Sequence, residues 1–92
     1  MLRKYIIERN VPGIGAHPSE AYCGIAQQSK DVLVTQGPGI QWLESFVVQD
    51  KTYCVYLAES EQIIREHAAK SGFPADRIEA VRTVIDPSLA PA

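Results

Sequence analysis

The sequence predicts an α+β domain with the ferredoxin-like order β-α-β-β-α-β, in which a four-stranded antiparallel sheet carries both helices on one face. Two observations support this prediction. The spacing of apolar residues changes from strand-like alternation to helical periodicity and back, twice along the chain. Between the two helical segments, two stretches rich in β-branched and aromatic residues flank Gln49-Asp50-Lys51, which indicates a hairpin. We therefore expect one domain, residues 1–92.

The first strand is expected near residues 2–9, where apolar residues alternate imperfectly before a loop rich in glycine and proline. The first helix is expected near 18–36, because Pro18 suits a first helical position and apolar residues recur with helical spacing. Gly37-Pro38-Gly39 then ends the helix.

The hairpin strands are expected near 40–49 and 52–58, but the length of their turn is left open by the sequence. A two-residue turn pairs odd-numbered residues of one strand with even-numbered residues of the other. A three-residue turn pairs odd with odd and even with even. Glu44 and Cys54 share a face of the sheet only in the second case.

The second helix is expected near 60–71, with Ser60 at its start and Gly72 at its end. The last strand is expected near 78–86, where two sets of residues alternate. Residues 87–92 have no periodicity and are expected to form a frayed tail.

A sheet with both helices on one face leaves its other face bare. Neither alternating set of the first hairpin strand is polar, since one contains Trp42, Phe46 and Val48 and the other contains Leu43 and Val47. We expect the bare face to pack on a second copy, which makes a homodimer of the dimeric α+β barrel type with a pocket between the sheets.

Composition excludes several classes of protein. The net charge is −2 with scattered basic residues, so a nucleic-acid partner is not expected. No stretch approaches the roughly 20 apolar residues of a membrane span, and the N-terminal apolar segment is too short for a secretion signal. The chain is expected to be cytoplasmic, without a membrane partner, and to keep Cys23 and Cys54 as free thiols.

Five residues are candidates for a ligand or metal site: Glu8, Glu44, Cys54, Tyr56 and His67. They are the polar or soft groups set within apolar strands or beside the buried face of a helix, where an unpaired charge is costly and a ligand would relieve it. Each also has a structural interpretation: Glu8 could be a solvated strand end or part of an ion pair, and Tyr56 could be an ordinary strand residue. Glu44 could discourage aggregation, Cys54 could be a small buried hydrophobe, and His67 could bond to the backbone.

Several segments carry a family resemblance: Thr52-Tyr-Cys-Val-Tyr-Leu-Ala-Glu-Ser-Glu61, Ile64-Arg-Glu-His-Ala68, Gly72-Phe-Pro-Ala-Asp-Arg-Ile78 and Val84-Ile-Asp-Pro87. With these segments the chain resembles the small bacterial nickel-binding protein family. The resemblance covers nearly the whole chain and implies a ferredoxin-like fold that dimerises, and a divalent metal, nickel, as the ligand. It does not imply an enzymatic activity.

The resemblance also implies histidine late in the first strand and in the middle of the second, where this sequence has Glu8 and Glu44. Imidazole and thiolate suit nickel better than carboxylate does, so we expect weaker nickel affinity than in histidine-rich relatives and a relative preference for harder ions.

Three functions compete. The first is a homodimer that binds a divalent metal through Glu8, Glu44, Cys54 and His67, or a small ligand that contacts Tyr56. The second is a cofactor-independent dimeric α+β barrel enzyme, an oxygenase or isomerase, with Glu44 or His67 as general base. The third is an oligomerising module without a ligand.

Overall fold

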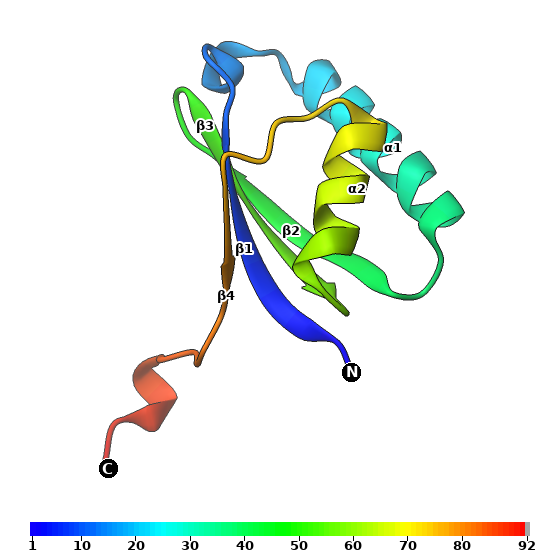
Figure 1. Ribbon diagram of the computed structural model, residues 1–92. Coiled ribbons are helices and arrows are strands. Elements are labelled where there is room, and N and C mark those ends of the chain that lie inside the picture. Colours follow the sequence, from blue (N-terminus) through cyan, green and yellow to red (C-terminus); the bar gives the residue numbers. More distant parts are fainter. Residues whose placement is uncertain (92) are drawn as a thin grey trace.

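The computed structural model describes residues 1–91 and has the predicted ferredoxin-like architecture (Figure 1). Four antiparallel strands lie in the order β2-β3-β1-β4, and α1 and α2 cover the same face of the sheet. The elements are β1 (Arg3–Asn10), α1 (Ser19–Gln36), β2 (Ile40–Val47), β3 (Lys51–Ala58), α2 (Glu61–Ser71) and β4 (Arg77–Ala80), with short 3-10 turns η1 (Ile14–Ala16) and η2 (Pro87–Leu89).

Residues at the ends of both helices explain where each helix begins and ends. Pro18 lies just before α1, and Gly37 ends that helix with a φ of 83°, a conformation that glycine adopts without strain. The hydroxyl of Ser60 accepts from the amide of Ile63 at 3.4 Å and caps α2, and Gly72 closes α2 with a φ of 77°.

The core lies between the sheet and the helices. Strand residues that point to the helices form it together with Ile64 of α2, namely Tyr5, Ile7, Ile40, Cys54, Tyr56 and Ala58. Alternation along β1 places Tyr5, Ile7 and Arg9 on this buried side.

The hairpin has a two-residue turn and a β-bulge, which together decide which side chains share a face. Val48 donates to the carbonyl of Lys51, so Gln49 and Asp50 form the turn. Ser45 therefore pairs with Cys54, and Glu44 pairs with Val55 on the opposite face.

The bulge between Trp42 and Glu44 then shifts the alternation of β2. Trp42 lines the helix side, whereas Phe46 borders the helix-free side, so the expectation that these two residues share a face is wrong. A bulge inserts one residue, and one residue is enough to reverse the face.

β4 ends at Ala80, so the predicted strand over 78–86 is too long. β4 pairs only with β1, and its last backbone bond runs from the amide of Val81 to the carbonyl of Lys4, near the first residue of β1. Among residues 1–91 no strand lies alongside it beyond that point, and alternation alone does not make a strand without a partner. In the predicted tail 87–92, residues 87–89 form η2, and Ala92 lies outside the described residues.

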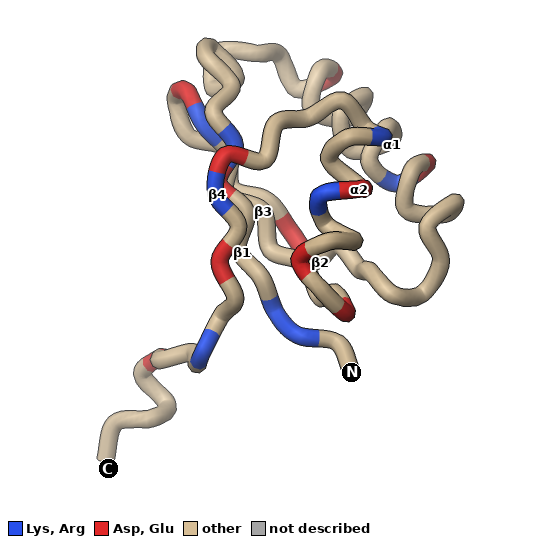
Figure 2. The backbone as a smooth tube through the Cα atoms, viewed as in Figure 1, with Lys and Arg blue, Asp and Glu red and all other residues tan. Residues whose placement is uncertain are grey.

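The helix-free face carries exposed apolar side chains, among them Ile6, Leu43 and Phe46, which are 41%, 46% and 52% exposed. Residues that follow β4 border a groove on this face with Lys4 and Glu44. Acidic and basic residues are interspersed along the chain (Figure 2). None of the helices within residues 1–91 has the length and apolar character needed to cross a bilayer.

The loop that carries η1 docks on the β2–β3 turn. The amide of Gly15 donates to the carbonyl of Gln49 at 3.0 Å, and the amides of Val11 and Gly13 donate to the carbonyl and the carboxylate of Asp50 at 2.9 Å. A Cβ at Gly15 would lie 2.6 Å from the carbonyl oxygen of Val48, so this close approach requires glycine.

Candidate functional site

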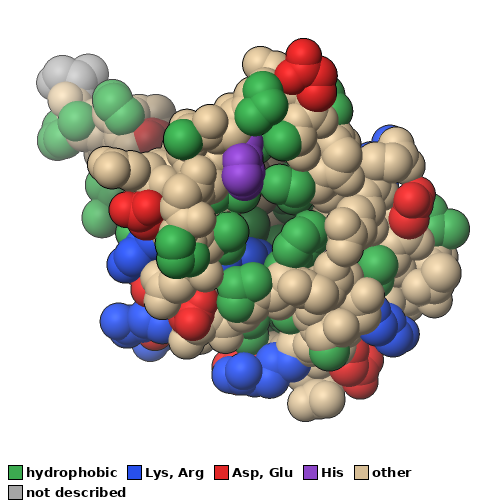
Figure 3. Space-filling model, turned by 90° about the horizontal axis from the view of Figure 1, so that it is seen from above, with side chains coloured by type: hydrophobic (Ala, Val, Ile, Leu, Met, Phe, Trp, Pro, Cys, Tyr) green, Lys and Arg blue, Asp and Glu red, His purple; other side chains and the backbone are tan. Residues whose placement is uncertain are grey.

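A cavity of about 340 Å³ lies between α1 and the sheet, at the end of the molecule where η1 meets the hairpin turn. Figure 3 shows a hollow at this end, surrounded by hydrophobic side chains and with a histidine beside it. Its walls come from α1, β1, β2, β3, η1 and the loop after α2. The lining residues are Arg9, Val11, Ile14, His17, Tyr22, Ile25, Ala26, Ser29, Trp42, Ser45, Val47, Thr52, Cys54, Tyr56 and Phe73.

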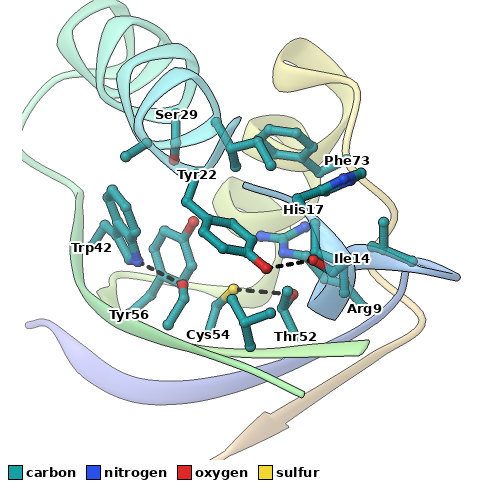
Figure 4. A pocket seen from close by; sticks show the side chains of 15 residues that line it. Arg9, Ile14, His17, Tyr22, Ser29, Trp42, Thr52, Cys54, Tyr56 and Phe73 are labelled. Atoms are coloured by element: carbon teal, nitrogen blue, oxygen red, sulfur yellow. Dashed lines mark hydrogen bonds between the residues drawn. The ribbon is translucent and has the colours of Figure 1, made fainter. Parts of the chain in front are cut away.

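Arg9 is the buried charge of this cavity, with only 3% of its surface exposed. Its Nη1 donates to the carbonyl of Pro74 at 2.6 Å, and its Cζ lies 6.0 Å from the centre of the Tyr56 ring. Its Nη2 has no hydrogen-bond partner within residues 1–91. In Figure 4 the guanidinium lies among the lining side chains, behind the ring of Tyr22.

Behind the cavity, His67 is fully buried and its ring makes three hydrogen bonds. Its Nδ1 lies 3.0 Å from Oε1 of Gln36, whose amide nitrogen donates to the carbonyl of Ile63. Because that oxygen can only accept, Nδ1 carries the proton of the neutral ring. Nε2 then accepts from the hydroxyls of Tyr56 at 3.1 Å and Ser29 at 3.2 Å.

Burial keeps both His67 and Tyr56 neutral. Desolvation, assisted by the positive charge of Arg9, lowers the pKa of His67 from 6.5 to about 4. Desolvation also raises the pKa of Tyr56 above 10, against the attraction of Arg9, which lowers it. Around neutral pH, Arg9 therefore carries the charge in this part of the molecule.

Cys54 lines the cavity as a buried free thiol, with its Sγ 3.7 Å from the hydroxyl of Thr52. Cys23 is also free, but it is exposed on α1.

Glu8 and Glu44 lie on the other face of the sheet. Glu8 pairs with Tyr53 in the ladder, and its carboxylate lies 3.7 Å from the ammonium of Lys51. Glu44 borders the helix-free groove. The structure thus brings Cys54, Tyr56 and His67 together on the helix side and separates them from both glutamates. The short hairpin turn fixes the face of Glu44, and the alternation of β1 fixes that of Glu8.

The separation of these residues across the sheet bears directly on metal binding. Within the part of the chain that the structure describes, no group of three or more His, Cys, Asp or Glu residues could hold a metal ion. The lone pair of His67 Nε2, which a metal would need, already accepts from two hydroxyls. A metal centre within one copy therefore does not fit these residues.

The sequence-based search did not select Arg9, Ser29, Tyr22 or Trp42 as site residues. A signal for Arg9 was present, because it continues the alternation of Tyr5 and Ile7 and so places a charge on the buried side of β1. A charge on the apolar side of a strand indicates a special environment. Ser29 and Tyr22 lie on a helix whose buried face depends on tertiary contacts.

Comparison with known proteins gives the family. Residues 5–81 match the family described as "Nickel responsive protein SCO4226-like". The chain belongs to this SCO4226-like family. The resemblance predicted from the sequence is thereby confirmed at the level of the family.

A solved structure supports the fold of this SCO4226-like protein. The crystal structure of SCO4226 from Streptomyces coelicolor A3(2) is similar with a TM-score of 0.75 at 15% identity, over 89% of this chain and 99% of that chain. A search among curated proteins gives no match.

Proposed function

We propose that this SCO4226-like protein binds a small organic molecule in the cavity between α1 and the sheet. The observation that carries the proposal is the cavity itself, which is mostly apolar, falls at the lower end of the roughly 300–1,000 Å³ typical of ligand pockets, and contains the buried Arg9. Aromatic side chains on two of its sides, Tyr22 and Trp42, suit a flat or branched apolar body.

Trp42 is the single tryptophan of the chain and lines the cavity, so its fluorescence reports occupancy. Small apolar acids and their amides are expected to change this fluorescence saturably. Ala26→Phe, which places a ring in the cavity, is expected to weaken binding by tenfold or more. Gln27→Phe adds the same ring at an exposed neighbouring position of α1 and is expected to bind like wild type. Equal binding by both variants would rule out this cavity as the site.

A second candidate, divalent-metal binding, is favoured by the description of the family as nickel responsive. Since one copy does not assemble a ligand set, this function depends on a homodimer formed through the helix-free face, which would bring two copies each of Glu8 and Glu44 to one interface. Exposed Ile6, Leu43 and Phe46 support such packing, because a second copy would remove them from water. Carboxylate ligands predict weaker nickel binding than a histidine-rich site gives.

Light scattering is expected to give twice the chain mass of 10.1 kDa at micromolar concentration. Phe46→Lys, which places a charge on the helix-free face, is expected to shift the mass toward that of one chain. Val34→Lys changes an 81% exposed valine on α1 and is expected to leave the mass unchanged. A wild-type mass of one chain would exclude the homodimer.

Calorimetric titration of the metal-stripped protein with nickel, zinc, cobalt and copper then tests whether a divalent metal binds. Binding that Phe46→Lys and Glu44→Gln both weaken would support a site between copies. Binding that neither variant changes would place the metal elsewhere.

A further inference from the structure

The buried guanidinium of Arg9 lacks a counter-charge. Of the described residues that line the cavity, none is Asp or Glu, and within residues 1–91 the Nη2 of Arg9 has no hydrogen-bond partner. One bond to Pro74 and the ring of Tyr56 leave this group only partly stabilised. An ion buried without a partner destabilises the folded protein, and an anion in the cavity would offset that cost.

Most other polar groups around the cavity already have partners, and His17, which also lines it, is exposed. The hydroxyl of Tyr22 donates to the carbonyl of Ile14 at 2.7 Å, and the indole of Trp42 donates to the hydroxyl of Ser45 at 2.9 Å. Tyr56 and Ser29 bond to His67. Arg9 is thus the buried group left to recognise a ligand by charge, and most of the remaining wall offers apolar surface (Figure 4).

We propose that the cavity binds a small monocarboxylic acid, whose carboxylate pairs with Arg9 and whose apolar body lies against Tyr22 and Trp42. This inference rests on the proposed function, that the cavity holds a small organic molecule. A planar carboxylate matches the fork of a guanidinium, and pairing it with one arginine leaves no residual charge in an apolar space. A phosphate dianion would bring a second charge, and the described lining residues include no lysine and no second arginine to pair with it; the histidine of the lining, His17, is exposed.

The electrostatics of the neighbours agree with a single anion. His67 is neutral above pH 6, and Tyr56 keeps its proton, so neither adds charge next to Arg9. A neutral ligand would leave the guanidinium without a counter-charge.

The test compares acids with their uncharged analogues. Phenylacetate and hexanoate, and the matching amides phenylacetamide and hexanamide, are titrated into the protein at pH 7.5 and followed by Trp42 fluorescence and calorimetry. Each acid is expected to bind about 10- to 100-fold more tightly than its amide, which is the range for a charge-assisted hydrogen bond. Inorganic phosphate is expected to bind more weakly than either acid.

Arg9→Met, which keeps the length of the side chain without its charge, is expected to bring the ratio of acid to amide affinity close to one. Lys4→Met removes a cation from the helix-free face and is expected to keep the wild-type ratio. Thermal unfolding shows whether Arg9→Met is folded; if it is not, Arg9→Lys, which keeps the charge without the fork, is expected to lower the ratio.

The possible results distinguish a failure of the carboxylate preference from a failure of the proposed function, which is small-molecule binding in the cavity. If acids and amides bind equally, and Ala26→Phe weakens both, the cavity binds small molecules but the carboxylate preference is wrong. Phosphate binding more tightly than the acids, in an Arg9-dependent manner, also overturns the preference. If no probe binds, or Ala26→Phe has no effect, both the inference and the proposed function fail.

Discussion

Replacement of His67 by glutamine is expected to remove much of the loss of stability that the wild-type protein shows between pH 6.5 and pH 4. His67 has a pKa of about 4 in the folded protein and 6.5 as its ordinary value. Between these values the unfolded chain binds more protons than the folded chain, so the free energy of unfolding decreases as the pH falls. The contribution is fully present above pH 6.5 and lost below about pH 4. It corresponds to about 3 kcal/mol.

Urea unfolding at pH 7.5, 6, 5 and 4, at one protein concentration, measures this dependence. Carboxylates titrate over part of the same range, so the informative quantity is the difference between wild type and His67→Gln at each pH. His17→Gln removes the other histidine, which is exposed before α1, and is expected to follow wild type. A difference that stays constant from pH 7.5 to 4 would show that His67 is not a buried neutral base.

Gly15→Ala is expected to destabilise the protein by about 1–3 kcal/mol and to weaken ligand binding in the same variant. The added Cβ would lie 2.6 Å from the carbonyl oxygen of Val48 and 2.8 Å from the Cα of Gln49. Both are backbone atoms of the hairpin, so the η1 loop must move. That loop carries Ile14, which forms part of the cavity wall.

Gly24→Ala is the matched control, because nothing lies within 4 Å of a Cβ at this position of α1. Alanine favours a helix more than glycine does, so this variant is expected to be more stable by about 0.5–1 kcal/mol. Denaturant midpoints and Trp42 fluorescence titrations measure both variants. Wild-type stability and affinity in Gly15→Ala would show that the contact between η1 and the hairpin turn does not shape the cavity.

The family and the candidate site have to be considered together. The family is described as nickel responsive. In this chain, however, the two glutamates lie on one face of the sheet, and Cys54 and His67 lie on the other side. The two proposed functions therefore use opposite faces, and Phe46→Lys and Ala26→Phe test them independently.

The sequence alone determined the order of elements and the family. Periodicity, the cap at Ser60 and the glycines at the helix ends are local features, and each depends on a few neighbouring residues. Such features predicted both helices, the hairpin and the ferredoxin-like order. They also predicted a strand beyond Ala80, because alternation persists there although β1 offers no further partner.

Only the tertiary structure decided which candidate residues share a site. A two-residue turn places Glu44 and Cys54 on opposite faces, a single-residue bulge separates Trp42 from Phe46, and neither feature has a decisive local signature. Likewise, the alternation of β1 predicts a buried Arg9, but its missing counter-charge depends on α1, the hairpin and the loop after α2, which are distant in sequence. Local preferences fix elements, whereas a binding site is defined by long-range contacts that no short segment contains.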